Sequence, residues 1–312
     1  MPRHAPVAYT FAVLLAACVD QPNDGAQVSQ IDSAVVGGTT AQQGQWPDAV
    51  AVLGTNGTCS GTLIAPDVVL TAGHCAGINP QQVIANTVDY SNSDNGVRVH
   101  VAHVEAYPNW QSSYDAAVLV LASPIQGVKP RKLGTSCTFD RVERATAVHL
   151  VGFGATDTMG QTANTQQREA MTEVTDPECT GGNGCKKALA PGGEFVAGGT
   201  GAADSCFGDS GGPVYLDTPV GTVVIGTVSR GVDNADTPCG GGGIYVRTDK
   251  LIEWIEQATG AVVEADDCET AYSGEDLPDD VAGDEGGCSA AGGSGLGALG
   301  LVLLALLRLR RR

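Results

Sequence analysis

The sequence predicts an all-β protein built from short antiparallel strands. The chain of 312 residues contains 43 glycines and few aromatic residues, a composition that favours turns and short strands over long helices. Apolar stretches recur along the chain and are separated by glycine and polar residues. Only near residues 249–258 does the apolar spacing follow a helical period. We therefore expect an antiparallel barrel or sandwich.

The expected strands lie in the central part of the chain, and the expected helix follows them. The strands are residues 49–53, 62–64, 68–70, 97–104, 116–121, 145–151, 214–216, 220–228 and 244–247. In the helix, residues 249–258, Leu251 and Ile255 lie on one face, and Asp249 is placed to cap its start. The chain length of 312 residues corresponds to one or two domains, with ample sequence to form a hydrophobic core.

Residues 204–213 contain a candidate nucleophile. Ser210 lies between Asp209 and Gly211, with Gly208 just before them. Because glycine tolerates backbone angles that other residues avoid, this turn can present a hydroxyl beside backbone N–H groups. Nucleophilic serine chemistry needs that arrangement, since the N–H groups stabilise the oxyanion. Alone, the same residues are also typical of an ordinary turn.

Two upstream motifs favour the catalytic interpretation. His74 stands between Gly73 and Cys75, and Asp115 opens an apolar strand. With Ser210 they give the chain order His, Asp, Ser, and over residues 35–258 the sequence resembles the chymotrypsin/trypsin-like serine proteases. The resemblance implies two six-stranded antiparallel β-barrels with a C-terminal helix, and an active site between the barrels.

The resemblance also implies a role for each site residue. Ser210 would attack a peptide carbonyl, His74 would accept and later donate the proton, and Asp115 would hold the imidazole. The backbone N–H groups of Gly208 and Ser210 would form the oxyanion hole. Phe153 replaces a tryptophan usual in the family and keeps an aromatic ring there. No metal and no cofactor is expected.

The position of Asp204 predicts which substrate side chain the enzyme binds next to the cleaved bond. It lies six residues before Ser210, where trypsin-like members carry the aspartate at the base of the primary pocket. An unpaired buried charge is costly, so substrate arginine or lysine is the expected partner. The pocket would also be lined by small residues: Ser229, Gly231 and Gly243. Two alternatives remain: Asp204 is a solvated loop acid, or Arg230, where the family usually has tryptophan, broadens the specificity.

Activation by proteolysis is expected. Val35 begins a motif that resembles the family's mature N-terminus, and the freed amine would pair with Asp209 in a buried ion pair. The cut would follow Ala34, which does not fit a pocket built for a cation. We therefore expect a zymogen that depends on a separate activating protease.

Both ends of the chain resemble export signals. Residues 1–17 predict a signal peptide; Cys18 resembles the lipidated cysteine of a bacterial lipobox, with a plain signal peptide as the alternative. Residues 288–312 resemble a myxobacterial sorting signal of the MYXO-CTERM type, processed near Cys288, with a simple tail anchor as the alternative. Between them we expect a pro-segment at 18–34, a protease domain at 35–262 and an acidic disordered linker at 263–287. The protein should be secreted, or anchored to the bacterial cell surface or outer membrane through its processed ends.

The other eight cysteines predict disulfides, because an even set in an exported protein is typical of them. The resemblance implies Cys59–Cys75 and Cys206–Cys239. Cys179 and Cys185 would close a short loop, and a metal site is a weak alternative because no histidine lies near them. Cys137 and Cys268 remain as a fourth pair.

The net charge of −18 limits the partners. Nucleic acid is not expected, because phosphate binding needs basic surface. Protein or peptide substrates are expected, and a monomer. The oxygen-rich residues 89–95 are either a calcium loop, as in some relatives, or a polar surface loop. The rival function is an inactive binding module, but such members usually lose a triad residue and this chain keeps all three.

Overall fold

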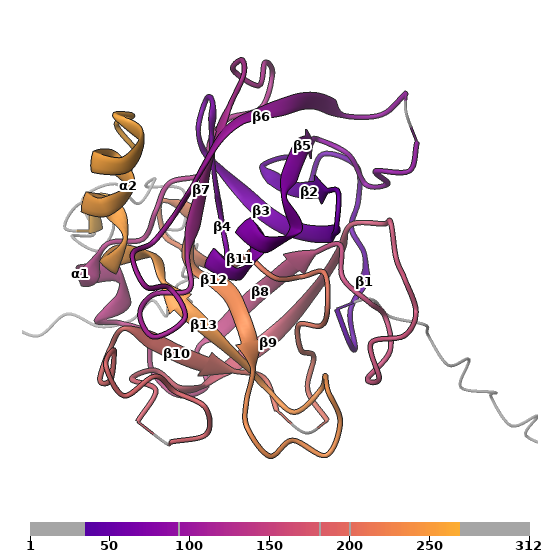
Figure 1. Ribbon diagram of the computed structural model, residues 1–312. Coiled ribbons are helices and arrows are strands. Elements are labelled where there is room, and N and C mark those ends of the chain that lie inside the picture. The colour runs from indigo at the N-terminus through magenta and orange to yellow at the C-terminus, as the bar shows by residue number, and fades with distance from the viewer. Residues whose placement is uncertain (1–34, 93, 181, 200, 269–312) are drawn as a thin grey trace, which may run out of the picture. The chain divides into compact units, whose positions relative to one another are not determined.

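The computed structural model describes residues 35–92, 94–180, 182–199 and 201–268. It confirms the expected fold: two closed six-stranded antiparallel β-barrels and a short C-terminal helix (Figure 1). The first barrel has the strand order β2-β3-β4-β7-β6-β5. Its strands are β2 (Ala49–Gly54), β3 (Gly57–Ala65), β4 (Val68–Thr71), β5 (Pro80–Ala85), β6 (Val97–Ala106) and β7 (Ala117–Leu121).

The second barrel closes where β8 pairs with β9, in the order β8-β9-β10-β13-β12-β11. Its strands are β8 (Ala147–Gly152), β9 (Arg168–Asp176), β10 (Glu194–Ala197), β11 (Pro213–Thr218), β12 (Gly221–Gly231) and β13 (Gly243–Arg247). The two-residue strand β1 (Thr39–Thr40) extends this sheet beside β9.

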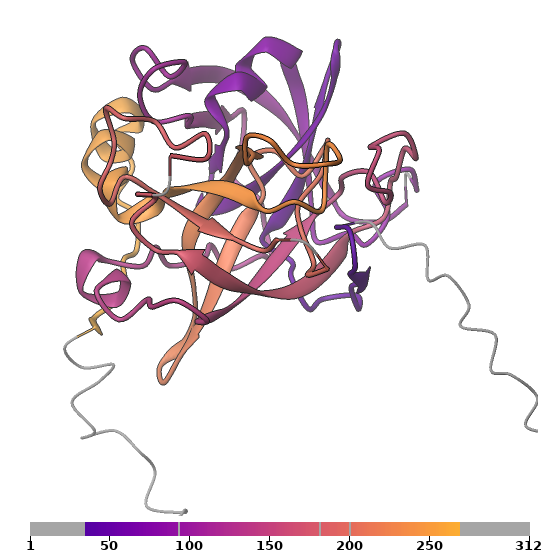
Figure 2. The ribbon, with the colours of Figure 1, turned by 90° about the horizontal axis from the view of Figure 1, so that it is seen from below.

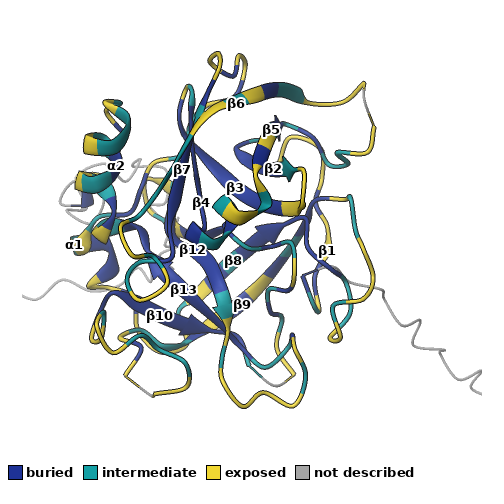
Figure 3. Cartoon of the chain, in the orientation of Figure 1, coloured by how far each residue is buried: buried dark blue, intermediate teal, exposed yellow. Residues whose placement is uncertain are grey.

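The two barrels share a core. Ile64 and Leu70 of the first barrel belong to the same buried cluster as Val151, Tyr215 and Val246 of the second. Figure 2 shows the first barrel, in indigo and purple, packed against the second, in pink and orange, and Figure 3 shows that the buried residues follow the strands while the connecting loops are exposed. Burial of this apolar surface stabilises the pair of barrels and fixes the loops that carry the site.

The closing helix begins later than expected. The 3-10 turn η2 (Thr248–Lys250) comes first, and α2 (Ile252–Thr259) follows it. Asp249 does not cap α2, because its carboxylate accepts two hydrogen bonds from the guanidinium of Arg247. The helix ends at Gly260, whose left-handed conformation (φ 69°) suits a glycine. Two further short elements are η1 (Gly73–Ile78) and α1 (Ser136–Phe139).

The packed body continues beyond residue 262, the expected boundary of the domain. Val263 is buried in the shared core, and Asp266 accepts hydrogen bonds from the backbone N–H of Thr135 and from the Thr138 hydroxyl. Cys268 is joined to Cys137 at the start of α1. The first residues of the expected acidic linker are therefore part of the body.

The segments expected to be a signal peptide, a pro-segment, the rest of an acidic linker and a C-terminal sorting signal, with Cys18 and Cys288, lie outside the described residues. Among the residues that the structure does describe, no helix is both long and apolar enough to span a bilayer.

Within the described residues, eight cysteines form four disulfides, in the same pairs as those expected. They are Cys59–Cys75, Cys137–Cys268, Cys179–Cys185 and Cys206–Cys239. Such a framework is typical of proteins that fold in an oxidising compartment.

Candidate active site

His74 and Asp115 are both presented by the first barrel. His74 lies in η1, directly after β4, and Asp115 lies two residues before β7. The ring Nδ1 of His74 is 2.9 Å from Asp115 Oδ2, and the backbone N–H of His74 donates to Asp115 Oδ1 at 2.9 Å. A Cβ on Gly73 would stand 3.0 Å from Asp115 Oδ1 and 2.8 Å from the Trp110 side chain. The close approach therefore requires glycine before the histidine.

Asp115 is held in its ionised form. Burial alone would raise the pKa of this carboxyl, but hydrogen bonds from His74 and Ser229 and the charge of His74 lower it below its ordinary value. An ionised carboxylate only accepts hydrogen bonds, so Nδ1 of His74 carries a proton. Whenever the ring is neutral, Nε2 is therefore its proton acceptor.

Ser229, on β12 of the second barrel, also contacts the aspartate. Its Oγ donates to Asp115 Oδ2 at 2.7 Å. The sequence assigned Ser229 to the wall of the substrate pocket, and the structure adds this direct link to Asp115. The carboxylate is thus oriented from both barrels.

Ser210 lies on a tight turn pressed against the first barrel. Its carbonyl accepts the backbone N–H of Ser60 at 2.9 Å. Gly208 has a φ of 99°, and a Cβ there would stand 2.9 Å from Gly154 Cα; a Cβ on Gly211 would overlap Thr71 Oγ1. The glycines beside the serine are therefore required by the backbone conformation and by the approach of the two barrels.

A cavity of about 400 Å³ brings the expected residues together. His74, Ser210, Ser229 and Gly231 line it, together with Phe207 and Arg230. Phe207 is exposed at this cavity, and it is a lining residue that the sequence did not single out.

Asp204 is buried, and its carboxylate is occupied by backbone donors. Oδ1 accepts the N–H of Ser205, and Oδ2 accepts those of Gly240 and Gly242, at 2.8 to 3.0 Å. Burial raises the pKa of Asp204, and the hydrogen bonds offset this only in part. Among the described residues, those that line the cavity do not include Asp204 or Gly243. A Cβ on Gly243 would overlap the Tyr245 hydroxyl, which explains the glycine.

The two residues of the expected activation pair are both buried but have other partners. Asp209 is 1% exposed, and its carboxylate accepts backbone N–H groups from Gly154 and Cys206, at 2.8 and 2.9 Å. Burial raises the pKa of Asp209 to about 7, although these hydrogen bonds act to lower it.

Val35, the other member of the pair, has a buried side chain. Its φ of 45° is unfavourable for a β-branched residue. The next residue, Val36, accepts the N–H of Asp204 through its carbonyl at 3.0 Å.

Neither metal interpretation finds support in the described residues. Cys179 and Cys185, the candidate ligand pair, form a disulfide with each other. Among the described residues, one group of potential ligands does cluster, His74 with Cys59 and Cys75, but these two cysteines are also joined in a disulfide. In the oxygen-rich loop, Arg98 Nη2 already donates to the carbonyls of Tyr90 and Asn92, at 2.8 and 2.9 Å. A guanidinium there supplies the positive charge that a calcium ion would otherwise bring.

Comparison with known proteins agrees with this geometry. The family model described as Trypsin matches residues 35–255. Chymotrypsin-like elastase family member 1 from Bos taurus is 29% identical over 256 residues, covering 73% of this chain and 91% of its own length. The Homo sapiens protein of the same name is 28% identical over 247 residues, covering 72% and 92%.

Among solved structures, the secreted serine protease VesC from Vibrio cholerae shares the fold, with a TM-score of 0.58 and 24% identity. The alignment covers 72% of this chain and 48% of that one, so the present chain spans about half the length of that structure. The chain belongs to the trypsin family of serine proteases. It is a serine endopeptidase, a hydrolase that acts on protein substrates.

Proposed function

We propose that His74, Asp115 and Ser210 form the catalytic triad of this endopeptidase. The observation that carries the proposal is that His74, hydrogen-bonded to Asp115, lines the same cavity as Ser210. Ser210 attacks the peptide carbonyl and gives its proton to Nε2 of His74, which passes it to the leaving amine. The developing imidazolium is stabilised by Asp115, and the oxyanion by the N–H groups of Gly208 and Ser210.

The test is Ser210→Ala in the processed enzyme. Turnover should fall by a factor on the order of 10⁶, because the triad acts as a unit, while thermal unfolding is unchanged. A serine-reactive phosphonate should label the wild-type protein and not the variant. A variant that keeps more than a few per cent of the activity rejects Ser210 as the nucleophile, and a wild-type chain that is never labelled supports the inactive binding module.

For specificity, we propose cleavage after arginine or lysine in a pocket of Asp204, Ser229, Gly231 and Gly243. Ser229 and Gly231 line the cavity, and Asp204 and Gly243 lie next to its lining residue Ser205. The burial of the Asp204 carboxylate supports this, because a substrate cation would compensate a charge that is costly to bury. Gly231 leaves room in the wall, since a Cβ there would have no neighbour closer than 3.5 Å.

A second specificity is favoured by one observation. The Asp204 carboxylate already accepts three backbone N–H groups, and the relatives reported above are named elastases. A pocket whose acid is satisfied internally would accept a broader range of side chains. Profiling the processed enzyme on a peptide library separates the two: a strong preference for arginine and lysine supports the first, and comparable rates on small apolar residues support the second.

The same proposal includes activation and export. Cleavage before Val35 would free an amine for Asp209, whose buried carboxyl has only backbone N–H partners among the described residues. Four disulfides favour an oxidising compartment, and VesC is named a secreted protease. Anchoring through the processed ends near Cys18 and Cys288 is tested by metabolic lipid labelling and by fractionation of cells that carry Cys18→Ser or Cys288→Ser.

A further inference from the structure

Arg230 is at the cavity, yet its guanidinium is fully engaged within the protein. Nη1 and Nη2 donate to the two carboxylate oxygens of Glu194 at 2.7 and 2.9 Å. Nε and Nη2 donate to the carbonyl of Gly184 at 3.2 and 2.6 Å, and Nη1 also donates to Ser229 Oγ at 3.0 Å. These five bonds use all five N–H donors of an arginine. Arg230 is therefore not a free cation for a substrate side chain.

The hydrogen bond from Arg230 to Ser229 determines where the hydroxyl proton of Ser229 points. A guanidinium never accepts a hydrogen bond, so Ser229 Oγ must be the acceptor. The hydroxyl proton of Ser229 is then directed to its other neighbour, Asp115 Oδ2, at 2.7 Å. We propose that Arg230 is a positioning residue for the catalytic aspartate, acting through the hydroxyl of Ser229. This inference rests on the triad proposed above.

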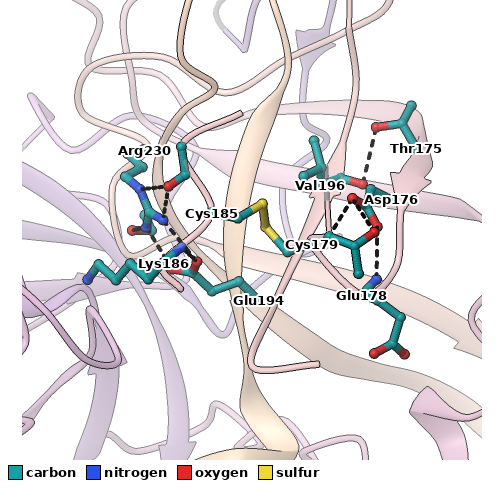
Figure 4. Close-up of a disulfide and its surroundings, with 12 residues drawn as sticks. Thr175, Asp176, Glu178, Cys179, Cys185, Lys186, Glu194, Val196 and Arg230 are labelled. Carbon is teal, nitrogen blue, oxygen red and sulfur yellow. Dashed lines mark hydrogen bonds and ion pairs between the residues drawn. A yellow bond between two sulfur atoms is a disulfide. The ribbon is translucent and has the colours of Figure 1, made fainter. Parts of the chain in front are cut away.

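Glu194 holds Arg230 in this position. Its carboxylate, on β10, is 1% exposed and also accepts the backbone N–H of Lys186 at 2.8 Å. A planar guanidinium bound at both oxygens of a carboxylate has little rotational freedom. Figure 4 shows Arg230 bound to Glu194. The pair therefore anchors the end of β12 that carries Ser229.

The loop closed by Cys179–Cys185 completes the arrangement. It supplies the Gly184 carbonyl, and directly after it Lys186 Nζ donates to the carbonyls of Trp110 and Ser113, both at 2.6 Å. Those two residues belong to the segment that leads into Asp115. Burial lowers the pKa of Lys186, and the nearby charge of Asp115 opposes this. The second barrel thus contacts both the carboxylate of Asp115 and the backbone before it.

The test removes both charges of the pair, because a single deletion would leave an uncompensated buried charge. Arg230→Met/Glu194→Gln is compared with the wild type in two backgrounds, with Ser229 and with Ser229→Ala. With Ser229 present, kcat should fall about tenfold, since the hydrogen bond from Ser229 to the aspartate is no longer held in one orientation, while KM changes less than twofold. With Ser229→Ala, the same change should lower kcat less than twofold, because the intermediary is already gone.

A matched control pair is Arg131→Met/Asp48→Asn. Asp48 is as buried as Glu194 and is bound at both oxygens by Arg131, but their further partners are Thr222 and Tyr215. This control should lose stability and keep kcat within twofold. Rates are normalised to active sites titrated with the phosphonate.

Should the double variant at Arg230 and Glu194 fail to fold, Arg230→Lys replaces it with the same expectations. The lysine ammonium lacks the planar, forked set of N–H donors by which the guanidinium reaches Glu194 and Ser229 together.

Three results would overturn the inference: a rise in KM at constant kcat, an equal loss of kcat in both backgrounds, or a tenfold loss in the control pair. Ser210→Ala is measured beside these variants. If wild-type turnover does not depend on Ser210, the proposed function fails, and the inference fails with it. If turnover depends on Ser210, the Arg230 series decides the inference alone.

Discussion

In the uncut chain, the buried carboxyl of Asp209 should make the protein less stable as the pH rises. Its pKa is raised to about 7, from an ordinary value of 3.8, because burial disfavours the charged form. A carboxyl with a raised pKa binds its proton more tightly in the folded state. Its stabilising contribution is therefore complete below pH 3.8 and is lost as the pH rises through 7.

The magnitude follows from the size of the shift. Each pKa unit corresponds to about 1.4 kcal/mol, so the whole effect is about 4 kcal/mol, of which about 2.5 kcal/mol falls between pH 5 and pH 8. The assay is urea denaturation of the Ser210→Ala precursor at pH 5, 6, 7 and 8. The reference is the same precursor with Asp209→Asn, which has nearly the same shape and no ionisable group at this position.

The other titratable groups are common to both proteins and cancel in the comparison. In Asp209→Asn the side-chain NH₂ group cannot accept the N–H of Cys206. The loss of this hydrogen bond lowers the free energy of unfolding of the reference by an amount that does not vary with pH. Between pH 5 and 8, the precursor with Asp209 should lose about 2.5 kcal/mol more stability than the Asp209→Asn reference loses. Parallel pH curves for the two proteins would refute the reasoning, since Asp209 would then be ionised throughout.

Two further predictions concern specificity and activation. Asp204→Ser should abolish a preference for arginine and lysine and favour apolar residues on the acyl side of the cut; a mutant that still prefers arginine places the pocket acid elsewhere. The enzyme should not activate itself, because Ala34 does not suit a cationic pocket: Ser210→Ala precursor mixed with active enzyme should remain uncut before Val35. Efficient cleavage there, found by N-terminal sequencing, contradicts either the specificity or the activation site.

The fold was predictable because its signals are local. Apolar runs marked β2, β4 and β7 almost to the residue, and the motifs around His74 and Ser210 fixed the family resemblance. Strands β1, β5, β9 and β10 were missed. In β9 the buried residues Ala170, Thr172 and Val174 alternate with the exposed residues Met171 and Glu173, so this strand has no continuous apolar run. Asp249 has the right residue type for a cap, but Arg247 occupies its carboxylate.

The arrangement around Arg230 was not predictable, because its parts are distant in sequence. Glu194 is buried in β10 only because Arg230, 36 residues later, neutralises it. From the sequence alone, a glutamate is expected to be exposed to solvent. An arginine in the place of the tryptophan usual in the family is expected to alter substrate recognition. Only the structure shows that the two charges satisfy each other and that Ser229 connects them to Asp115.

The link between Cys137 and Cys268 has a mechanical consequence. Beyond helix α2, the last described residue, Cys268, is bonded covalently to Cys137 at the start of α1. A pulling force applied to the chain after Cys268 is transmitted through that bond into α1. Helix α2 lies between the two cysteines, which are 131 positions apart in the sequence, and so lies outside the path of the load. The second barrel, whose strands β8 to β13 all lie between the two cysteines, should therefore resist extension from its C-terminal side until the disulfide is reduced.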